Sequence, residues 1–177
     1  GCGCPFWAVG RLEVAMLDRE FVQQNRRELS YLTGSFLTEH LIRVHAAFEG
    51  DLTAAVVLGT IGHHYIQRFY DEVARDSPQG LDRLVEAGTH LPRVRTCNAM
   101  SVSAATGIPR ETVRRKVRWL ARKGWVAVGA GGALSLVPGM SKDFEEFDIE
   151  TIVRFHHAAQ GGIQQLPRRS RARRAQK

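Results

Sequence analysis

The sequence predicts a mainly α-helical fold with one small β-hairpin, and three observations support this. Apolar residues recur every three or four positions through most of residues 11–74, which is the spacing of amphipathic helices. Glycine and proline divide residues 98–124 into two short helices, because these residues mark helix ends and starts. Two short apolar runs then flank the glycine-rich segment 129–132, as the strands of a hairpin flank its turn.

The first part of the chain is expected to form three helices. A roughly helical pattern runs over Arg11–Tyr31, and a second helix is predicted over Ser35–Phe48. Asp51 is a suitable N-cap for a third helix that continues to about Ala74. Because residues 52–61 are apolar nearly all round, we expect the third helix to be buried between neighbours.

The next two helices have clear start and stop signals. The first is expected to begin near Asn98 or Ser101, either of which could cap it, and to stop at Gly107. Pro109 suits the first turn of the second helix, where its missing N–H is no loss. Gly124 then supplies a left-handed stop.

The C-terminal part is predicted to contain a hairpin and one more helix. Strands are expected over Trp125–Val128 and Ala133–Val137. Ser141 or Asp143 is expected to start a final amphipathic helix, and Gly161-Gly162 to end it.

These elements predict a division of the chain at Ser77-Pro78-Gln79-Gly80, the clearest break signal in the sequence. We expect residues 1–10 to be disordered or a remnant of processing or cloning. The remaining expected parts are an N-terminal helical domain for dimerisation (11–77), a DNA-binding domain (81–140), a C-terminal helix (141–162) and a basic disordered tail (163–177).

Positive charge is concentrated in two segments of the chain. The formal net charge is +7, yet residues 109–124 alone hold seven basic side chains and one acid. The tail 168–177 holds six more basic residues and no acid, and the rest of the chain is net negative. Such focusing is expected where one surface meets phosphate. The tail could track the phosphate backbone as an arm or be a solvated terminus, and its composition fits both.

The order of elements from 98 to 137 predicts a particular fold. A short helix, a tight turn, an arginine-rich helix and a hairpin form the layout of a winged helix-turn-helix with a two-stranded β wing, which docks on DNA. A solvated basic helix face would give the same charge pattern. The turn Thr106-Gly107-Ile108, the proline start and the glycine-tipped hairpin favour DNA contact. The expected fold class is therefore mainly α, a winged helix-turn-helix preceded by an N-terminal helical domain.

Two sequence elements resemble a known family. Pro109-Arg110-Glu111-Thr112-Val113-Arg114 and Leu120-Ala121-Arg122-Lys123-Gly124-Trp125 are similar to the recognition-helix start and the turn into the wing of GntR-type bacterial transcriptional regulators, over about residues 95–137. The resemblance implies that Arg110 and Arg114 read guanines, that Thr112 bonds a phosphate, and that Gly131 or its neighbours approach the minor groove. In that family the DNA-binding module comes first, whereas a helical region precedes it here, so the resemblance implies a docking mode and not an effector chemistry.

Physical reasoning assigns similar roles within the predicted recognition helix, 109–123. The first turns of such a helix enter the major groove, so Arg110, Glu111 and Arg114 are best placed to meet base edges. Arginine pairs with guanine, and glutamate can accept from cytosine N4. Glu111 is equally well explained as a first-turn acid that stabilises the helix N-terminus. Arg115 and Arg118 lie further round or further back and are assigned to phosphates.

Other chemistries find little support in the sequence. The adjacent pairs His63-His64 and His156-His157 point about 100° apart on a helix and do not converge on one ion, so we expect no metal. The chain has no phosphate loop, nucleophile elbow or paired metal-ligand motif, so neither catalysis nor a cofactor is predicted. Cys97 is a lone thiol, interpreted as a small buried hydrophobe.

The N-terminal helices have two interpretations. They could form a scaffold that pairs two copies of the chain, so that two DNA-reading modules meet half-sites about one helical turn apart. They could also hold a pocket for an unknown effector among Phe36, His40, His63, Tyr65, Phe69 and Tyr70. Aromatic residues at helical spacing more often fill a core, so the scaffold is preferred. The helix from Asp143 to Ala159 is a second candidate for the dimer interface.

The sequence as a whole predicts a homodimeric, sequence-specific regulator of transcription of bacterial type, such as a repressor, that binds double-stranded DNA. The alternative is an architectural, plasmid-replication or chromosome-organising protein with little sequence preference. A protein-docking role for the same fold is disfavoured by the charge of helix 109–123. No apolar run approaches the ~20 residues of a membrane span, so a cytoplasmic, nucleoid-associated protein is expected.

Overall fold

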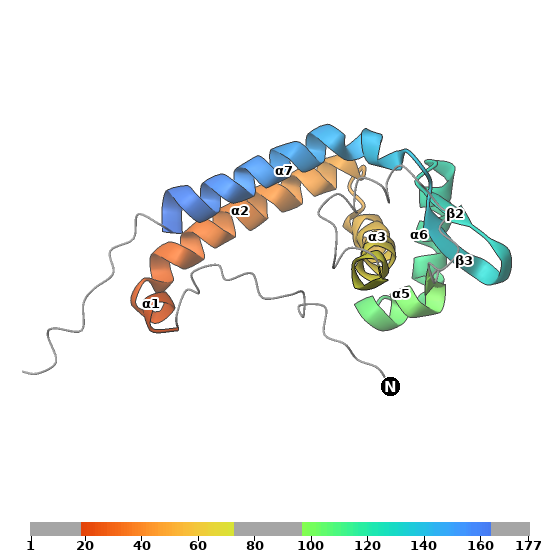
Figure 1. Cartoon of the computed structure of the whole chain (residues 1–177), viewed down its shortest axis with the longest axis horizontal. Coiled ribbons are helices and arrows are strands. Elements are labelled where there is room, and N and C mark those ends of the chain that lie inside the picture. Colours follow the sequence, from red (N-terminus) through yellow and green to blue (C-terminus); the bar gives the residue numbers. More distant parts are fainter. Residues whose placement is uncertain (1–18, 73–96, 164–177) are drawn as a thin grey trace, which may run out of the picture. The chain divides into compact units, whose positions relative to one another are not determined.

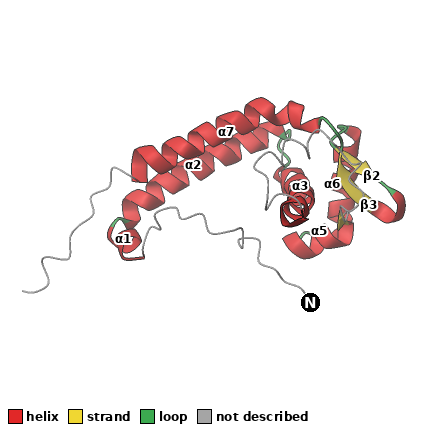
Figure 2. Cartoon of the chain, in the orientation of Figure 1, coloured by secondary structure: helices red, strands yellow, loops and turns green. Residues whose placement is uncertain are grey.

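The structure is a computed structural model that describes residues 19–72 and 97–163, with side chains over 19–64 and 97–160. The expected boundary at 77–80, the first ten residues and the basic tail lie outside the described residues. In chain order the elements are α1 (Arg19–Gln24), α2 (Arg26–Ala47), α3 (Leu52–Glu72), β1 (Cys97–Asn98), α5 (Ala99–Thr106), α6 (Arg110–Arg122), β2 (Val126–Val128), the 3₁₀ turn η3 (Ala130–Gly132), β3 (Ala133–Leu136), the 3₁₀ helix η4 (Met140–Phe144), α7 (Glu145–His157) and the π-helical segment η5 (Ala158–Ile163). The mainly α-helical prediction is confirmed, with one small antiparallel sheet (Figure 2).

The chain divides into two compact units, one of residues 1–36 with 154–177 and one of residues 37–153. This division differs from the expected one, because α3 belongs with α5, α6 and the sheet and not with a separate N-terminal domain. The physical reason is one hydrophobic face of α3. Ala54, Val57, Leu58 and Ile61 recur every three or four residues and are all buried.

The core of the second unit lies where α3, α5, α6 and the sheet meet (Figure 1). Val102 of α5 and Val113 of α6 are fully buried there. Residues 52–61 were expected to be buried between neighbours, and Ala54, Val57, Leu58 and Ile61 are buried, whereas Leu52 and Val56 are exposed. The helix has an outer face that sequence apolarity alone did not reveal.

The sheet has three strands in the order β1-β3-β2. The predicted hairpin is confirmed: Val126 pairs with Leu136 and Val128 with Leu134. Two strands were expected, but the sheet has a third, because Cys97 also pairs with Leu134. This pairing ties the start of α5 to the hairpin.

The connection between α5 and α6 is short and internally bonded. Asn98 caps α5 by accepting from the N–H groups of Met100 and Ser101 at 2.9 and 3.0 Å. Gly107 ends the helix with φ +72°, which favours glycine. Pro109 lies at the N-cap of α6, one position before the first turn predicted for it.

In the second unit, α2 from Leu37 onward runs beside α7 up to Val153 (Figure 1). The Arg43 guanidinium donates to Thr151 Oγ1 at 3.1 Å and to the Phe147 carbonyl at 3.0 Å. It also lies 4.6 Å from the centre of the Phe147 ring. One arginine therefore anchors α2 to α7 by hydrogen bonds and a cation–π contact.

The helix boundaries near the N-terminus differ from the prediction. The helix expected over Arg11–Tyr31 is interrupted at Asn25, and α2 then continues without a break through Gly34 to Ala47. At the other end of the chain, η5 extends the helical path past Gly161-Gly162, where an end was expected. Within the first unit, Phe36 and Phe155 make an edge-to-face contact with ring centres 5.5 Å apart.

Candidate nucleic-acid interface

Helix α6 has one apolar face and one basic face. Val113, Val117 and Leu120 recur at helical spacing and are all buried. The opposite face carries exposed charged side chains: Arg110, Glu111, Arg114, Arg115, Arg118 and Arg122. Burial of the stripe therefore fixes which side of α6 presents arginine to solvent.

The loop before α6 holds its first turn in place. The Ser103 hydroxyl donates to the Ile108 carbonyl at 2.7 Å, and the Ile108 N–H donates to Thr106 Oγ1 at 3.2 Å. No described side chain caps the helix at Pro109. The first N–H groups of α6 therefore add the positive end of the helix dipole to the arginines beside them.

Two lysines, Lys116 in α6 and Lys123 at its C-cap, pair with acids of the turn between α2 and α3. Lys116 pairs with Asp51, the residue that also caps α3 by accepting from the Ala54 N–H at 2.9 Å. Lys123 pairs with Glu49 in the same turn between α2 and α3. Desolvation of Asp51 would raise its pKa, but hydrogen bonds from Lys116 and from backbone N–H groups outweigh it and lower the pKa. These two lysines serve the fold, and the outward charge of α6 comes from arginine.

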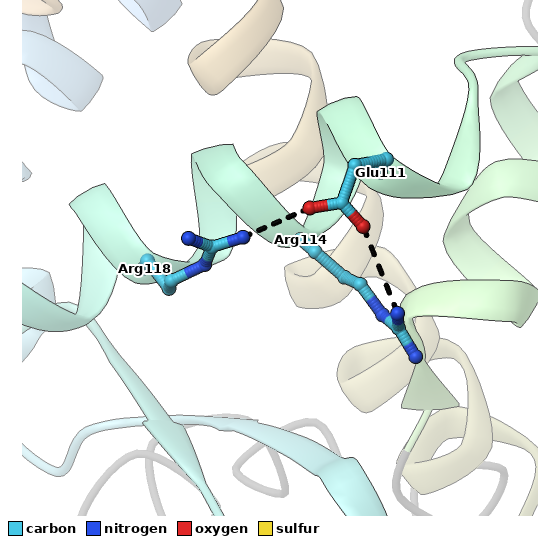
Figure 3. Close-up of polar contacts among 3 residues, drawn as sticks. All are labelled: Glu111, Arg114 and Arg118. Carbon is cyan, nitrogen blue, oxygen red and sulfur yellow. Dashed lines mark hydrogen bonds and ion pairs between the residues drawn. The ribbon is translucent and has the colours of Figure 1, made fainter.

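Glu111 sits between two arginines of the outer face. Its Oε1 accepts from Arg118 Nη2 at 2.9 Å, and its Oε2 lies 3.6 Å from Arg114 Nη1. Figure 3 shows both guanidinium groups turned toward the one carboxylate. All three side chains are more than half exposed to solvent. The sequence interpretations of Glu111 did not include this bridging contact.

A shallow cavity of about 340 Å³ lies between α6, the start of α5 and the hairpin. It brings together several predicted site residues, namely Arg110, Glu111, Arg114, Arg118 and Gly131. Thr112 and Arg115 do not line it: Thr112 is half-buried on α6, and Arg115 is exposed elsewhere on the helix. We call this cavity the α6 groove.

No protein-family model, curated protein or solved structure matches this chain. The function is therefore argued from the α6 groove and its surroundings.

Sequence reasoning missed some of the groove's lining. Asn98 was identified as a helix cap, but not as a groove residue. Met100, Val128 and Gly132 also line the groove. No local signal could have placed Met100 there, because its position depends on the pairing of β1 with β3.

The other candidate sites are dispersed or absent among the described residues. Phe36 contacts Phe155, and His40 lies 5.8 Å from the Phe147 ring. His63 is on α3, and Tyr65, Phe69 and Tyr70 lie outside the residues whose side chains the structure describes. Within residues 19–64 and 97–160, no three metal-ligating side chains of the His, Cys, Asp or Glu type gather.

Two further findings bear on the sequence expectations. Cys97 is buried, as interpreted from the sequence, and burial raises the pKa of its thiol. None of the helices in the described segments combines the length and apolarity that a membrane crossing needs.

Proposed function

We propose that residues 52–72 and 97–137 belong to a winged helix-turn-helix and that the chain is a sequence-specific regulator of transcription that binds double-stranded DNA as a homodimer. The observation that carries this proposal is the exposed arginine face of α6, next to a groove shared with the hairpin. A regulator of this kind acts at the nucleoid.

The connection of α5 and α6 supports the helix-turn-helix part. Three residues, Gly107, Ile108 and Pro109, separate the two helices, and a turn of three or four residues that often contains glycine is typical of this motif. The hairpin β2–β3 follows α6 after Gly124. The motif docks its second helix in the major groove, which is the role we assign to α6.

The charged residues of α6 divide into two roles under this proposal. Arg110 and Arg114 lie in the first two turns, where side chains reach base edges, and a bidentate arginine–guanine contact contributes about 1–3 kcal/mol of discrimination. Arg115 and Arg118 lie further along and bind phosphates, as does Thr112. The hairpin tip around Gly131 carries no charge, so it approaches the minor groove through its backbone.

The dimer interface is assigned to α7. Ile149, Ile152 and Val153 form an exposed apolar stripe at helical spacing. The first turn of α7 is acidic, with Glu145, Glu146 and Asp148, and its last turn is basic. Two copies of α7 packed antiparallel would bury the stripe and bring opposite charges together, which fits a two-fold symmetric contact.

Selection of bound sequences from a random duplex pool at ~150 mM salt tests the function, because nonspecific charge binding is weakened there. An enriched inverted repeat supports the dimeric regulator. Recovery of DNA without a motif favours the architectural alternative, and no recovery contradicts DNA binding. The selection is repeated with Arg110→Ala, which changes the recovered sequence in a regulator and weakens binding uniformly in an architectural protein.

A further inference from the structure

The α6 groove contains one acid, Glu111, among its arginines. A surface that only binds phosphate would need cations and no acid. Glu111 contacts Arg118 at 2.9 Å and Arg114 at 3.6 Å from its two carboxylate oxygens. All three residues line the groove together with Arg110. A DNA backbone that approaches either arginine therefore meets the carboxylate as well.

These ion pairs contribute little to the stability of the fold. The side chains of Glu111, Arg114 and Arg118 are 71%, 51% and 65% exposed, and water screens ion pairs between exposed side chains. The ion pairs instead determine which chemical groups the α6 groove can bind. A phosphate that binds Arg114 or Arg118 must displace the Glu111 carboxylate. The negative charge of this carboxylate also repels the phosphate.

A base edge meets a different situation. The carboxylate can accept a hydrogen bond from the N4 amino group of cytosine. The released Arg114 can then pair with guanine, and the released Arg118 can bind a phosphate. A base pair of the right identity thus compensates Glu111 for its lost partners, whereas a phosphate does not. Glu111 therefore lowers the affinity for DNA of arbitrary sequence and leaves the affinity for the correct sequence unchanged.

From this geometry we propose that Glu111 is a specificity-determining residue, which suppresses backbone binding at Arg114 and Arg118 and admits DNA that presents cytosine to its carboxylate. This inference rests on the proposed function. It goes beyond that function in assigning to one acid the difference between specific and nonspecific binding.

The test compares the full-length protein with Glu111→Gln at ~150 mM salt. Binding is measured by fluorescence anisotropy to the duplex recovered by selection and to a scrambled duplex of the same composition. Glu28→Gln is the matched control, because Glu28 is an exposed acid in the first turn of α2, outside the groove and the proposed dimer contact, and its loss changes the net charge equally.

We expect Glu111→Gln to bind the scrambled duplex about five- to tenfold more tightly, with no gain for the selected duplex. Its dependence of log Kd on log salt should steepen by about one to two units, since the freed arginines contact phosphates. Unchanged or weaker binding to the scrambled duplex overturns the inference, as does an equal gain from Glu28→Gln. If the unsubstituted protein binds neither duplex, the proposed function itself fails. That result differs from the two outcomes that overturn only the inference about Glu111.

Discussion

The indole Nε1 of Trp125 donates a hydrogen bond to Asp143 Oδ2 at 3.0 Å. Trp125 follows α6, and Asp143 belongs to the 3₁₀ helix that leads into α7. The same indole packs edge-on against Phe48 and Phe144, with ring centres 5.6 and 4.9 Å away. Trp125 thus connects the end of α6 to the segment before α7.

Packing, more than the hydrogen bond, should account for the contribution of Trp125. We expect Trp125→Ala to lower the free energy of unfolding by about 2–4 kcal/mol, because a largely buried aromatic ring is lost. Asp143→Ala should cost only about 0.5–1 kcal/mol, since its bond is exposed. Urea unfolding followed by circular dichroism measures both. Equal losses from the two variants would show that the polar contact dominates.

The Asp51–Lys116 pair predicts a change in stability in acid. The pKa of Asp51 in the folded protein lies below its ordinary value of 3.8, so its stabilising effect is present above about pH 4 and is lost as pH falls through the folded pKa. Asp51→Asn keeps a side-chain oxygen for the cap but removes the charge. We expect it to be less stable than the unsubstituted protein by about 1 kcal/mol at pH 7. The free energies of unfolding of the two proteins should converge as pH falls through the folded pKa of Asp51, and a constant difference would contradict the assignment.

Gly34 offers a stabilising substitution. It lies inside α2, and a Cβ added there meets nothing within 4 Å. Gly34→Ala should raise the free energy of unfolding by about 0.5–1 kcal/mol, because alanine loses less backbone entropy in a helix. Gly124→Ala is the opposing control: with φ +78° it should cost about 1–2 kcal/mol. Thermal unfolding distinguishes the two, and destabilisation by Gly34→Ala would mean that α2 is not continuous there.

The exposed stripe of α7 predicts the oligomeric state of its variants. Ile152→Asp places a charge in the proposed interface and should weaken self-association about tenfold or more. Val56→Asp is the control, since Val56 is also exposed and apolar but lies on α3. Sedimentation equilibrium of both variants checks the assignment. The α7 interface is excluded if Ile152→Asp self-associates like the control.

Much of the region from 98 to 137 could be predicted because its signals are local. Asn98, Gly107 and Gly124 fix helix ends through their own backbone preferences or side chains. The spacing of Val113, Val117 and Leu120 identifies the buried face of α6 without knowledge of what covers it. The outward position of Arg114 and Arg118 follows from the same spacing.

The parts that could not be predicted depend on contacts between distant residues. Strand β1 has only two residues, and its pairing of Cys97 with Leu134 spans a long stretch of chain. The apolar character of α3 was visible in the sequence, but nothing local indicates which face of the helix packs against α5 and α6. Glycine is unfavourable inside helices, yet α2 continues through Gly34. The bridge from Glu111 to two arginines depends on rotamers, about which the sequence is silent.

Matched charge removal tests whether the exposed arginines of α6 bind DNA, as proposed. Affinity for the selected duplex is measured at ~150 mM salt for Arg114, Arg115 and Arg118 all replaced by Ala. A second variant has Arg171, Arg173 and Arg174 replaced by Ala, so that the same charge is removed from the tail. The account predicts a loss of about 100-fold for the α6 variant and less than about tenfold for the tail variant. Equal losses, or an α6 variant that binds like the unsubstituted protein, would contradict it.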